Sequence, residues 1–450
     1  MKRNVYFIGI GGIGMSAIAR YYNHAGYNVS GYDKTPSSLT DELVKEGIAI
    51  HFSPDIEAIP KDIENTLVIY TPAVPADMEE MVFIFEKGYK IIKRSRALGE
   101  IASEKKCLAI SGTHGKTTTS TMLAHIIQSS GEGATSFLGG ISKNYGTNLL
   151  LSESDILVAE ADEFDRSFLQ LKPAIAAVTS MDADHLDIYN DTRTLRQAFV
   201  EFASGVSESL VVKKGLEKHF SGISARCYTY SYDNGGDFYP YDITMDKNNR
   251  IVFSLYLNGE SIEGCTVGVP GKVNVENAVA AAAVAYLHGT SAENIKRALK
   301  TFCGVKRRFD IRFEKNGILY IDDYAHHPEE LAASISSIKG IYPSRKLCAV
   351  FQPHLFSRTK DFYKEFAQSL SKADSVILLP IYPAREEPIP GVNSEMILER
   401  ITCPDAKVIQ KNELIEEIKR KELDILVTFG AGDIDRLVEP IEHCLTELYV

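Results

Sequence analysis

The sequence SGTHGKTTT at residues 111–119 lies between a short apolar run, Cys107–Ile110, and a helical run at 120–129. A glycine-rich turn that joins a strand to a helix leaves backbone N–H groups free at the helix N-terminus, where they bind phosphate oxygens. Lys116 adds a positive charge, and Thr117 adds a hydroxyl that suits Mg²⁺. The stretch therefore predicts a nucleotide phosphate loop, formed by Gly112, Thr113, His114, Gly115, Lys116, Thr117 and Thr118.

Acidic residues follow the next two apolar strands of the chain. One strand runs into Glu160, and the next runs into an acidic stretch that contains His185. The carboxyl ends of parallel strands meet at one edge of a sheet, where ligands bind. Because Mg²⁺ prefers oxygen ligands, we expect Glu160 to bind the metal and His185 to offer a second metal-binding position. A solvated acidic loop is the better interpretation for Glu163 and Asp165.

A second glycine-rich turn, GIGGIG at residues 9–14, also lies between a strand and a helix. Asp33 follows at the distance typical of a fingerprint that binds a pyrophosphate on the helix N-terminus and a ribose on the acid. The pattern alone leaves NAD, FAD and a UDP-sugar open. The predicted contacts are Gly9, Gly11, Gly12, Gly14, Met15, Ser16 and Asp33.

The composition is that of an ordinary globular α/β chain. With 450 residues, 44% of them hydrophobic, the length suggests about three domains. The net charge of −11 argues against a nucleic-acid partner, since such proteins need an excess of cations. No apolar run approaches the roughly 20 residues that cross a bilayer, so we expect no membrane insertion and a cytoplasmic location. Seven cysteines without a CxxC pair indicate buried thiols.

Strand and helix patterns predict two Rossmann-like domains around a central P-loop ATPase-type domain. The central domain also carries alternating strands between Asp237 and Val269, with Asn258-Gly259 as a turn, which predicts an antiparallel patch. The predicted domains are residues 1–103, 104–303 and 304–450.

Several polar motifs in the second half of the chain are further candidates. Asn274 and Asn277 lie on one face of a helix start and suit a base or ribose, although Asn274 also fits a helix N-cap. Arg308 follows the proposed second domain joint, where a cation can reach phosphates. His326 lies between a strand and a helix, among residues suited to substrate or nucleotide contacts. Arg358 lies in a polar, cationic loop suited to a carboxylate.

The chain resembles the Mur ligases over almost its whole length. The order of the motifs carries the resemblance: GIGGIGMSAIA, SGTHGKTTT, EADEFDRSF, MDADHLD, VPGKVNVENA, RRFD, DDYAHHP, FQPHLFSRT and FGAGDI. Ile110 stands where the common GxxxxGK[ST] pattern has its first glycine, and this shorter loop also resembles the family. Leu355 departs from the resemblance, because many members have arginine after the histidine of FQPH.

The resemblance implies an ATP-dependent ligase that joins L-alanine to the carboxylate of UDP-N-acetylmuramate through an acyl-phosphate. It implies that the first domain holds the UDP-sugar, the central domain MgATP and the last domain the amino acid. By the same resemblance, Lys116, Glu160, His185 and Arg308 are catalytic, and Thr117, Glu160 and His185 bind metal. Asn274, Asn277, Arg308 and Asp323 would contact the nucleotide, and His326 and Arg358 the L-alanine.

Other functions stay open at this point. A ligase that adds a preformed tripeptide to the same UDP-sugar shares nearly every motif. An NAD-dependent oxidoreductase accounts for GIGGIG but not for GTHGKTTT, and a non-catalytic nucleotide-binding regulator is a third possibility. The sequence leaves the oligomeric state open.

Overall fold

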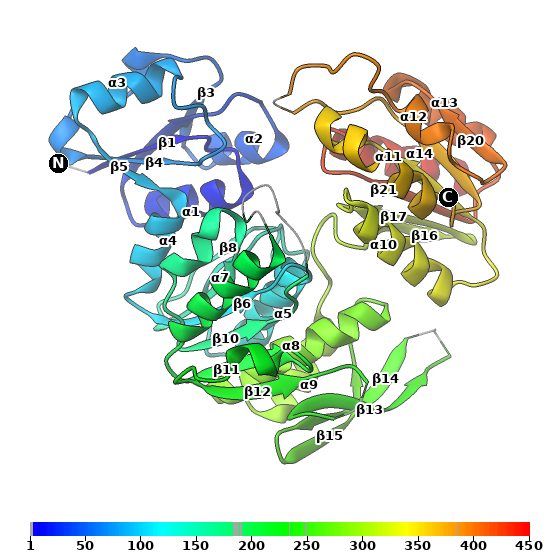
Figure 1. Ribbon diagram of the computed structural model, residues 1–450, viewed down its shortest axis with the longest axis horizontal. Coiled ribbons are helices and arrows are strands. Elements are labelled where there is room, and N and C mark those ends of the chain that lie inside the picture. Colours follow the sequence, from blue (N-terminus) through cyan, green and yellow to red (C-terminus); the bar gives the residue numbers. More distant parts are fainter. Residues whose placement is uncertain (1–2, 183–188, 190, 234, 248–249, 385) are drawn as a thin grey trace. The chain divides into compact units, whose positions relative to one another are not determined.

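The computed structural model describes the chain apart from residues 1–2, 183–188, 190, 234, 248–249 and 385 (Figure 1). The chain forms two compact units, residues 1–303 and 304–450. The first unit contains two sheets and the second contains one. This three-domain α/β architecture confirms the predicted fold class, whereas the exact domain boundaries stay predictions.

The first sheet is parallel throughout, with the order β3-β2-β1-β4-β5. Alternate residues of its central strand face opposite cores, because successive side chains in a strand point to opposite sides. The prediction of a Rossmann-like first domain is confirmed. Its elements are β1 (Asn4–Ile8), α1 (Ile13–His24), β2 (Asn28–Tyr32), α2 (Ser38–Lys45), β3 (Ala49–His51), η1 (Ile56–Ala58), η2 (Ile63–Asn65), β4 (Thr66–Tyr70), α3 (Glu79–Lys87), β5 (Lys90–Lys93) and α4 (Arg94–Ala102).

The central sheet has ten strands in the order β15-β14-β13-β12-β11-β10-β6-β9-β7-β8. Strands β12 through β7 in this order are parallel, and helix α5 packs against α8 and α9. The elements up to α7 are β6 (Lys106–Ser111), α5 (Lys116–Ser129), β7 (Thr135–Phe137), β8 (Leu149–Leu150), β9 (Ile156–Ala161), η3 (Phe164–Gln170), β10 (Ile175–Val178) and α7 (Thr192–Ser204). The rest are β11 (Ser209–Lys213), η4 (Glu217–Phe220), β12 (Arg226–Tyr230), β13 (Phe238–Met245), β14 (Ile251–Leu257), β15 (Glu260–Thr266), α8 (Lys272–His288) and α9 (Ala292–Thr301).

The predicted antiparallel patch is confirmed at one edge of this sheet, where β13, β14 and β15 form successive hairpins (Figure 1). The second hairpin turns at Asn258 and Gly259, whose φ angles are 46° and 109°. Leu257 pairs with Glu260 across this two-residue turn. Positive φ at both turn positions matches the right-handed twist of the strands, which is why Asn-Gly is favoured there.

The sheet of the second unit has the order β16-β17-β21-β18-β19-β20, and only its edge strand β16 runs antiparallel. Helices α10 and α11 pack against each other over one core, and α14 contacts β16 and β17. The elements are β16 (Asp310–Lys315), β17 (Ile318–Asp323), α10 (Pro328–Ile341), β18 (Leu347–Phe351), α11 (Phe356–Leu370), β19 (Ser375–Leu378), α12 (Glu395–Leu398), β20 (Asp405–Val408), η5 (Lys411–Glu413), α13 (Leu414–Arg420), β21 (Ile425–Phe429) and α14 (Asp435–Tyr449).

The two sheets of the first unit share one hydrophobic core, which joins Phe7 and Ile18 to Leu157 and Phe199. Asn148 strengthens this joint, because its amide nitrogen donates to the carbonyl of Ile13 at 2.6 Å. The same side chain accepts from the Arg20 guanidinium at 2.5 Å. A polar side chain of the central domain therefore holds helix α1 of the first domain.

The cysteines are less buried than the sequence indicated. Cys107, Cys265, Cys348 and Cys444 are buried as expected, but Cys227 and Cys303 are exposed and Cys403 is intermediate. Among the described residues, no helix is both long enough and apolar enough to cross a membrane.

Candidate active site

The phosphate loop connects β6 to α5, and two glycines give it its shape. Gly112 and Gly115 have φ angles of 131° and 77°, which L side chains rarely adopt. A Cβ at Gly112 would lie 2.1 Å from the Thr179 hydroxyl oxygen, so the loop also packs tightly against the end of β10. Helix α5 has no acidic residue in its first turn, which keeps its N-terminus attractive to anions.

Lys116, the first residue of α5, forms a buried ion pair with Glu163. The ammonium lies 2.9 and 2.8 Å from the two carboxylate oxygens, and the Glu163 side chain is fully buried. Burial favours a lower pKa for Lys116, but the carboxylates of Glu163, Asp162 and Glu160 outweigh it and raise that pKa. The assignment of Glu163 to a solvated loop is therefore wrong, because its charge is matched by the lysine of the phosphate loop. Asp165, by contrast, is partly exposed and pairs with Lys93.

Glu160 lies within the last residues of β9, because this strand continues to Ala161 instead of ending at Val158. Its carboxylate accepts from the Thr117 hydroxyl at 3.1 Å and from the Gly139 backbone N–H at 3.1 Å. A carboxylate beside a threonine hydroxyl fits Mg²⁺, which binds through one or two carboxylates together with phosphate oxygens. Thr117 and Glu160 therefore meet as the sequence predicted.

The strand after Glu160 contributes Ser180, which the sequence reasoning did not single out. Its hydroxyl contacts the Thr113 hydroxyl at 2.9 Å and accepts from the His114 backbone N–H at 2.8 Å. The loop is thus fixed from the end of β10 as well. His185, the second predicted metal position, lies outside the described residues, and no group of three or more acidic, His or Cys side chains suited to a metal occurs within them.

Helix α8 brings Asn277 to the phosphate loop. A Cβ at Gly115 would lie 2.7 Å from the Asn277 side-chain oxygen, so the glycine allows this close approach. Asn274 is not the helix N-cap, which is Gly271, and its amide donates to the Pro270 carbonyl at 2.6 Å. Both asparagines are largely buried.

The N-terminal glycine turn connects β1 to α1, and Asp33 organises it. The Asp33 carboxylate accepts from the Gly11 N–H at 2.7 Å and from the Thr35 N–H at 3.0 Å. Asp33 therefore shapes the turn from within. Met15 and Ser16 are buried, while Gly12 is exposed at the start of the helix. The exposed amides of this turn lie at the carboxyl edge of the first sheet, where the predicted pyrophosphate site belongs.

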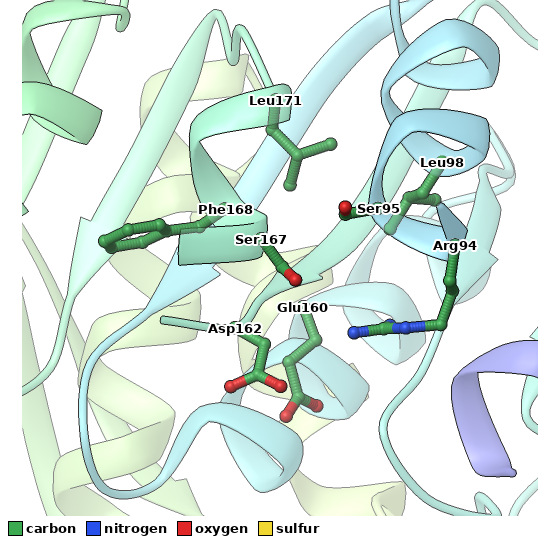
Figure 2. A pocket seen from close by; sticks show the side chains of 8 residues that line it. All are labelled: Arg94, Ser95, Leu98, Glu160, Asp162, Ser167, Phe168 and Leu171. Carbon is green, nitrogen blue, oxygen red and sulfur yellow. The ribbon is translucent and has the colours of Figure 1, made fainter. Parts of the chain in front are cut away.

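A small pocket in the first unit is lined by Arg94 and Ser95 of α4 and by Glu160 and Asp162 at the end of β9. Figure 2 shows the Arg94 side chain extending from its helix toward these carboxylates. Arg94 could not be identified from the sequence, since an arginine at a helix start carries no motif. Its position near Glu160 and Asp162 depends on how the two sheets of this unit pack together.

In the second unit, Asp323 ends β17 and is nearly buried. It accepts from the Ser334 hydroxyl at 2.6 Å and from the Ala325 N–H at 3.3 Å. Burial raises the pKa of Asp323 to about 6, against the opposing effect of the Ser334 hydrogen bond and the Arg308 charge. The Arg308 guanidinium also lies over the Tyr324 ring, 5.0 Å from its centre. Arg308 and Asp323 therefore belong to one cluster.

His326 and Arg358 belong to the same cluster. Burial lowers the pKa of His326, and the charges of Arg358 and Arg308 lower it further, although Glu330 opposes them. A neutral imidazole at pH 7 follows. The prediction that Arg358 lies in a loop is wrong, because α11 begins at Phe356 and Arg358 lies in its first turn. Leu355 precedes this helix with a φ of 73°, an unusual conformation for a branched side chain.

These features define an α/β protein with two strand–glycine turn–helix units at sheet edges and a carboxylate beside one of the turns. Comparison with known families is specific. Residues 4–106 match the Mur ligase family catalytic domain, residues 110–285 the Mur ligase middle domain, and residues 307–432 the Mur ligase glutamate ligase domain. The chain belongs to the Mur ligase family.

Full-length relatives agree with this assignment. The chain is 49% identical to the UDP-N-acetylmuramate–L-alanine ligase of Porphyromonas gingivalis, with 100% of both chains covered. It is 50% identical to the enzyme of the same name from Flavobacterium psychrophilum, over 99% of this chain and 98% of that one. The crystal structure of UDP-N-acetylmuramate–alanine ligase from Thermotoga maritima superposes with a TM-score of 0.85 and 28% identity, over 99% of this chain and 100% of that one.

The close contact between Gly139 and Glu160 leads to a prediction for Gly139→Ala. The added Cβ would lie 2.1 Å from a Glu160 carboxylate oxygen, so Glu160 must move away from Thr117. We expect the Mg²⁺ concentration for half-maximal phosphate release to rise about tenfold or more, because the metal loses a preorganised ligand. A Mg²⁺ titration of ATP turnover measures this. Gly340→Ala, in open space on α10, is the control, and an unchanged Mg²⁺ requirement would contradict the assignment.

The buried Asp323 carboxyl leads to a prediction about stability. Its pKa of about 6 lies above the ordinary value of 3.8, so the folded state binds its proton more tightly than the unfolded state does. The free energy of unfolding should therefore fall, by up to about 3 kcal/mol, as the pH rises from about 4 to 6. Asp323→Asn removes this penalty and should raise the free energy of unfolding at pH 8 more than at pH 5.

Urea unfolding at the two pH values measures the difference. Asp361→Asn, at an exposed carboxyl of the same unit, is the matched control. An equal effect of Asp323→Asn at both pH values would show that the Asp323 pKa is not raised.

Proposed function

We propose that this chain joins L-alanine to the carboxylate of UDP-N-acetylmuramate, with ATP converted to ADP and phosphate, in the synthesis of peptidoglycan precursors. The observation that carries the proposal is the meeting of the phosphate loop with Glu160, in a chain that matches L-alanine ligases end to end. ATP and nucleotide sugars are cytoplasmic metabolites, so the proposal extends to the cytoplasm.

The reaction must first activate a carboxylate, which is a poor electrophile. A carboxylate oxygen of the sugar attacks the γ-phosphorus of ATP, and ADP leaves with the electron pair of the broken P–O bond. The free amine of L-alanine then attacks the acyl carbon. Phosphate leaves, and the nitrogen loses a proton as the amide forms. No covalent intermediate with the protein is needed, so catalysis is a matter of positioning and charge.

The first unit supplies the groups for phosphoryl transfer. Helix α5 directs its N-terminal amides at the phosphates, and Lys116 offers a charge that Glu163 keeps in place. Thr117 and Glu160 would hold Mg²⁺, which neutralises charge on the phosphates when bound. Asn277 lies beside this loop. Asn274 and Asn277 are assigned to the nucleotide, and His185 to the metal, by family resemblance.

The N-terminal glycine turn is assigned to the diphosphate of the UDP-sugar, through Gly9, Gly11, Gly12, Gly14, Met15 and Ser16, with Asp33 supporting the turn. Its role parallels that of the phosphate loop, because both place helix amides at the carboxyl edge of a parallel sheet. In this way one turn holds the molecule to be activated, and the other holds the ATP that activates it.

The second unit is assigned to the amino acid. Arg358 is a cation suited to the carboxylate of L-alanine, and a neutral His326 is able to accept a proton from its ammonium group. Arg308 and Asp323 are assigned to contacts with the nucleotide. Because Leu355 replaces the arginine common in the family, the carboxylate contact depends more on Arg358.

A substrate panel tests the reaction. The purified chain should release phosphate from MgATP only with UDP-N-acetylmuramate, and much faster with L-alanine than with L-serine, glycine or a preformed tripeptide. One methyl group is worth roughly 10- to 200-fold in such a comparison, so glycine is the sharpest competitor. A preference for the tripeptide would instead identify a recycling ligase, and oxidation of NADH without phosphate release would identify an oxidoreductase.

Lys116→Ala tests the role of the phosphate loop. We expect kcat to fall on the order of 100- to 1,000-fold, because the charge that stabilises the transferring phosphoryl group is lost. UDP-N-acetylmuramate binding, measured by calorimetry, should persist. Since the single change leaves Glu163 buried without its cation, the double variant Lys116→Met with Glu163→Gln serves as a second test with both charges removed.

Lys172→Ala, at an exposed lysine of the same domain, is the control for this experiment. Near-normal kcat in both Lys116 variants would rule out the phosphate assignment.

A further inference from the structure

Arg94 is one of three neighbouring cations at the junction of β5 and α4. Lys93 pairs with Asp165 at 3.0 Å, and Arg96 pairs with Glu100 at 3.0 Å on the exposed side of the helix. The Arg94 guanidinium is partly buried and has no hydrogen-bond or ion-pair partner within the described part of the chain. Of the three cations, Arg94 is the one without an ion pair among the described residues.

The guanidinium lies against the N-terminal glycine turn. Its Nη1 atom is 2.6 Å from the place where a Cβ at Gly14 would be, so the glycine makes room for it. Gly14 lies in the first turn of α1, whose amides form the proposed diphosphate site. The cation is therefore held beside the backbone groups that would receive the same anion.

Arg94 also lines the pocket that contains Glu160 and Asp162 (Figure 2). Glu160 is already engaged by the Thr117 hydroxyl and the Gly139 N–H. A partly buried arginine without a partner loses part of its hydration, and a phosphate would supply charge-assisted hydrogen bonds to it. The position between Gly14 and Glu160 is where a molecule would pass from the glycine turn to the activation site.

We propose that Arg94 binds an oxygen of the UDP-sugar diphosphate and so directs the sugar from α1 toward Glu160. The inference rests on the proposed function for the identity of the ligand. The diphosphate is favoured over the sugar carboxylate because the close contact of the guanidinium is with Gly14. Arg94 is then a binding residue whose interaction is the same in the ground state and in the transition state.

Calorimetry with three ligands tests the proposal on Arg94→Met. UDP and UDP-N-acetylglucosamine carry the diphosphate without the lactoyl carboxylate, and UDP-N-acetylmuramate carries both. We expect all three to bind between about tenfold and 100-fold more weakly, as for a lost hydrogen bond to a charged group. KM for the UDP-sugar should rise with kcat little changed, and KM for ATP should stay the same.

Arg96→Met is the matched control. It also removes one positive charge, two residues further along the chain, but this charge belongs to an exposed ion pair with Glu100. Arg94→Lys keeps the charge but lacks the planar guanidinium, so its affinity should lie between those of the wild type and Arg94→Met. This variant keeps the test valid if Arg94→Met folds poorly. A loss confined to UDP-N-acetylmuramate would overturn the proposal and assign Arg94 to the carboxylate. Unchanged affinity for all three ligands would overturn it as well.

The two proposals fail in different ways. If the wild-type chain binds UDP but shows no L-alanine-dependent phosphate release, the proposed function fails, and the comparison of UDP affinities still tests Arg94. If wild-type turnover is normal and both Arg94 variants bind UDP normally, only the Arg94 inference fails.

Discussion

The ion pair between Lys116 and Glu163 is the interaction on which the site in the first unit depends. A lysine at the start of α5 is almost buried there, and it stays charged because carboxylates from the end of β9 and the following turn surround it. Both Glu163 oxygens contact the ammonium, so its position is defined before any nucleotide arrives. An entering phosphate finds a cation in place, and it must share that cation with Glu163.

Glu160, near the end of β9, is held in a different way from Glu163. Its carboxylate is oriented by a hydroxyl of the phosphate loop and by a backbone amide at Gly139, so it has little freedom to turn. Two carboxylates near the end of β9 thus differ in role: Glu163 fixes the lysine, and Glu160 is the residue proposed to bind the metal. Their surroundings differ, because the Glu163 side chain is fully buried whereas Glu160 lines a pocket.

Strand and turn patterns predicted much of this arrangement from the sequence, including the parallel sheet of the first domain, the hairpin at Asn258 and the meeting of Thr117 with Glu160. These features follow from residues close together in the chain, or from the rule that parallel strand ends converge. Glu163, Asn148 and Arg94 were not identified correctly, because their environment is created by segments distant in sequence. An acidic residue looks the same in a sequence whether it faces water or a buried lysine.

Asn148 has a further consequence for how the first unit behaves as a whole. Its amide joins the carbonyl of Ile13 and the guanidinium of Arg20, both on α1, to the edge of the central sheet, above a core that both sheets share. Because the two sheets share this core and these hydrogen bonds, unfolding of one removes contacts that stabilise the other. A nucleotide sugar bound at α1 would then protect the ATP-binding domain against heat, even though it touches mainly the other sheet.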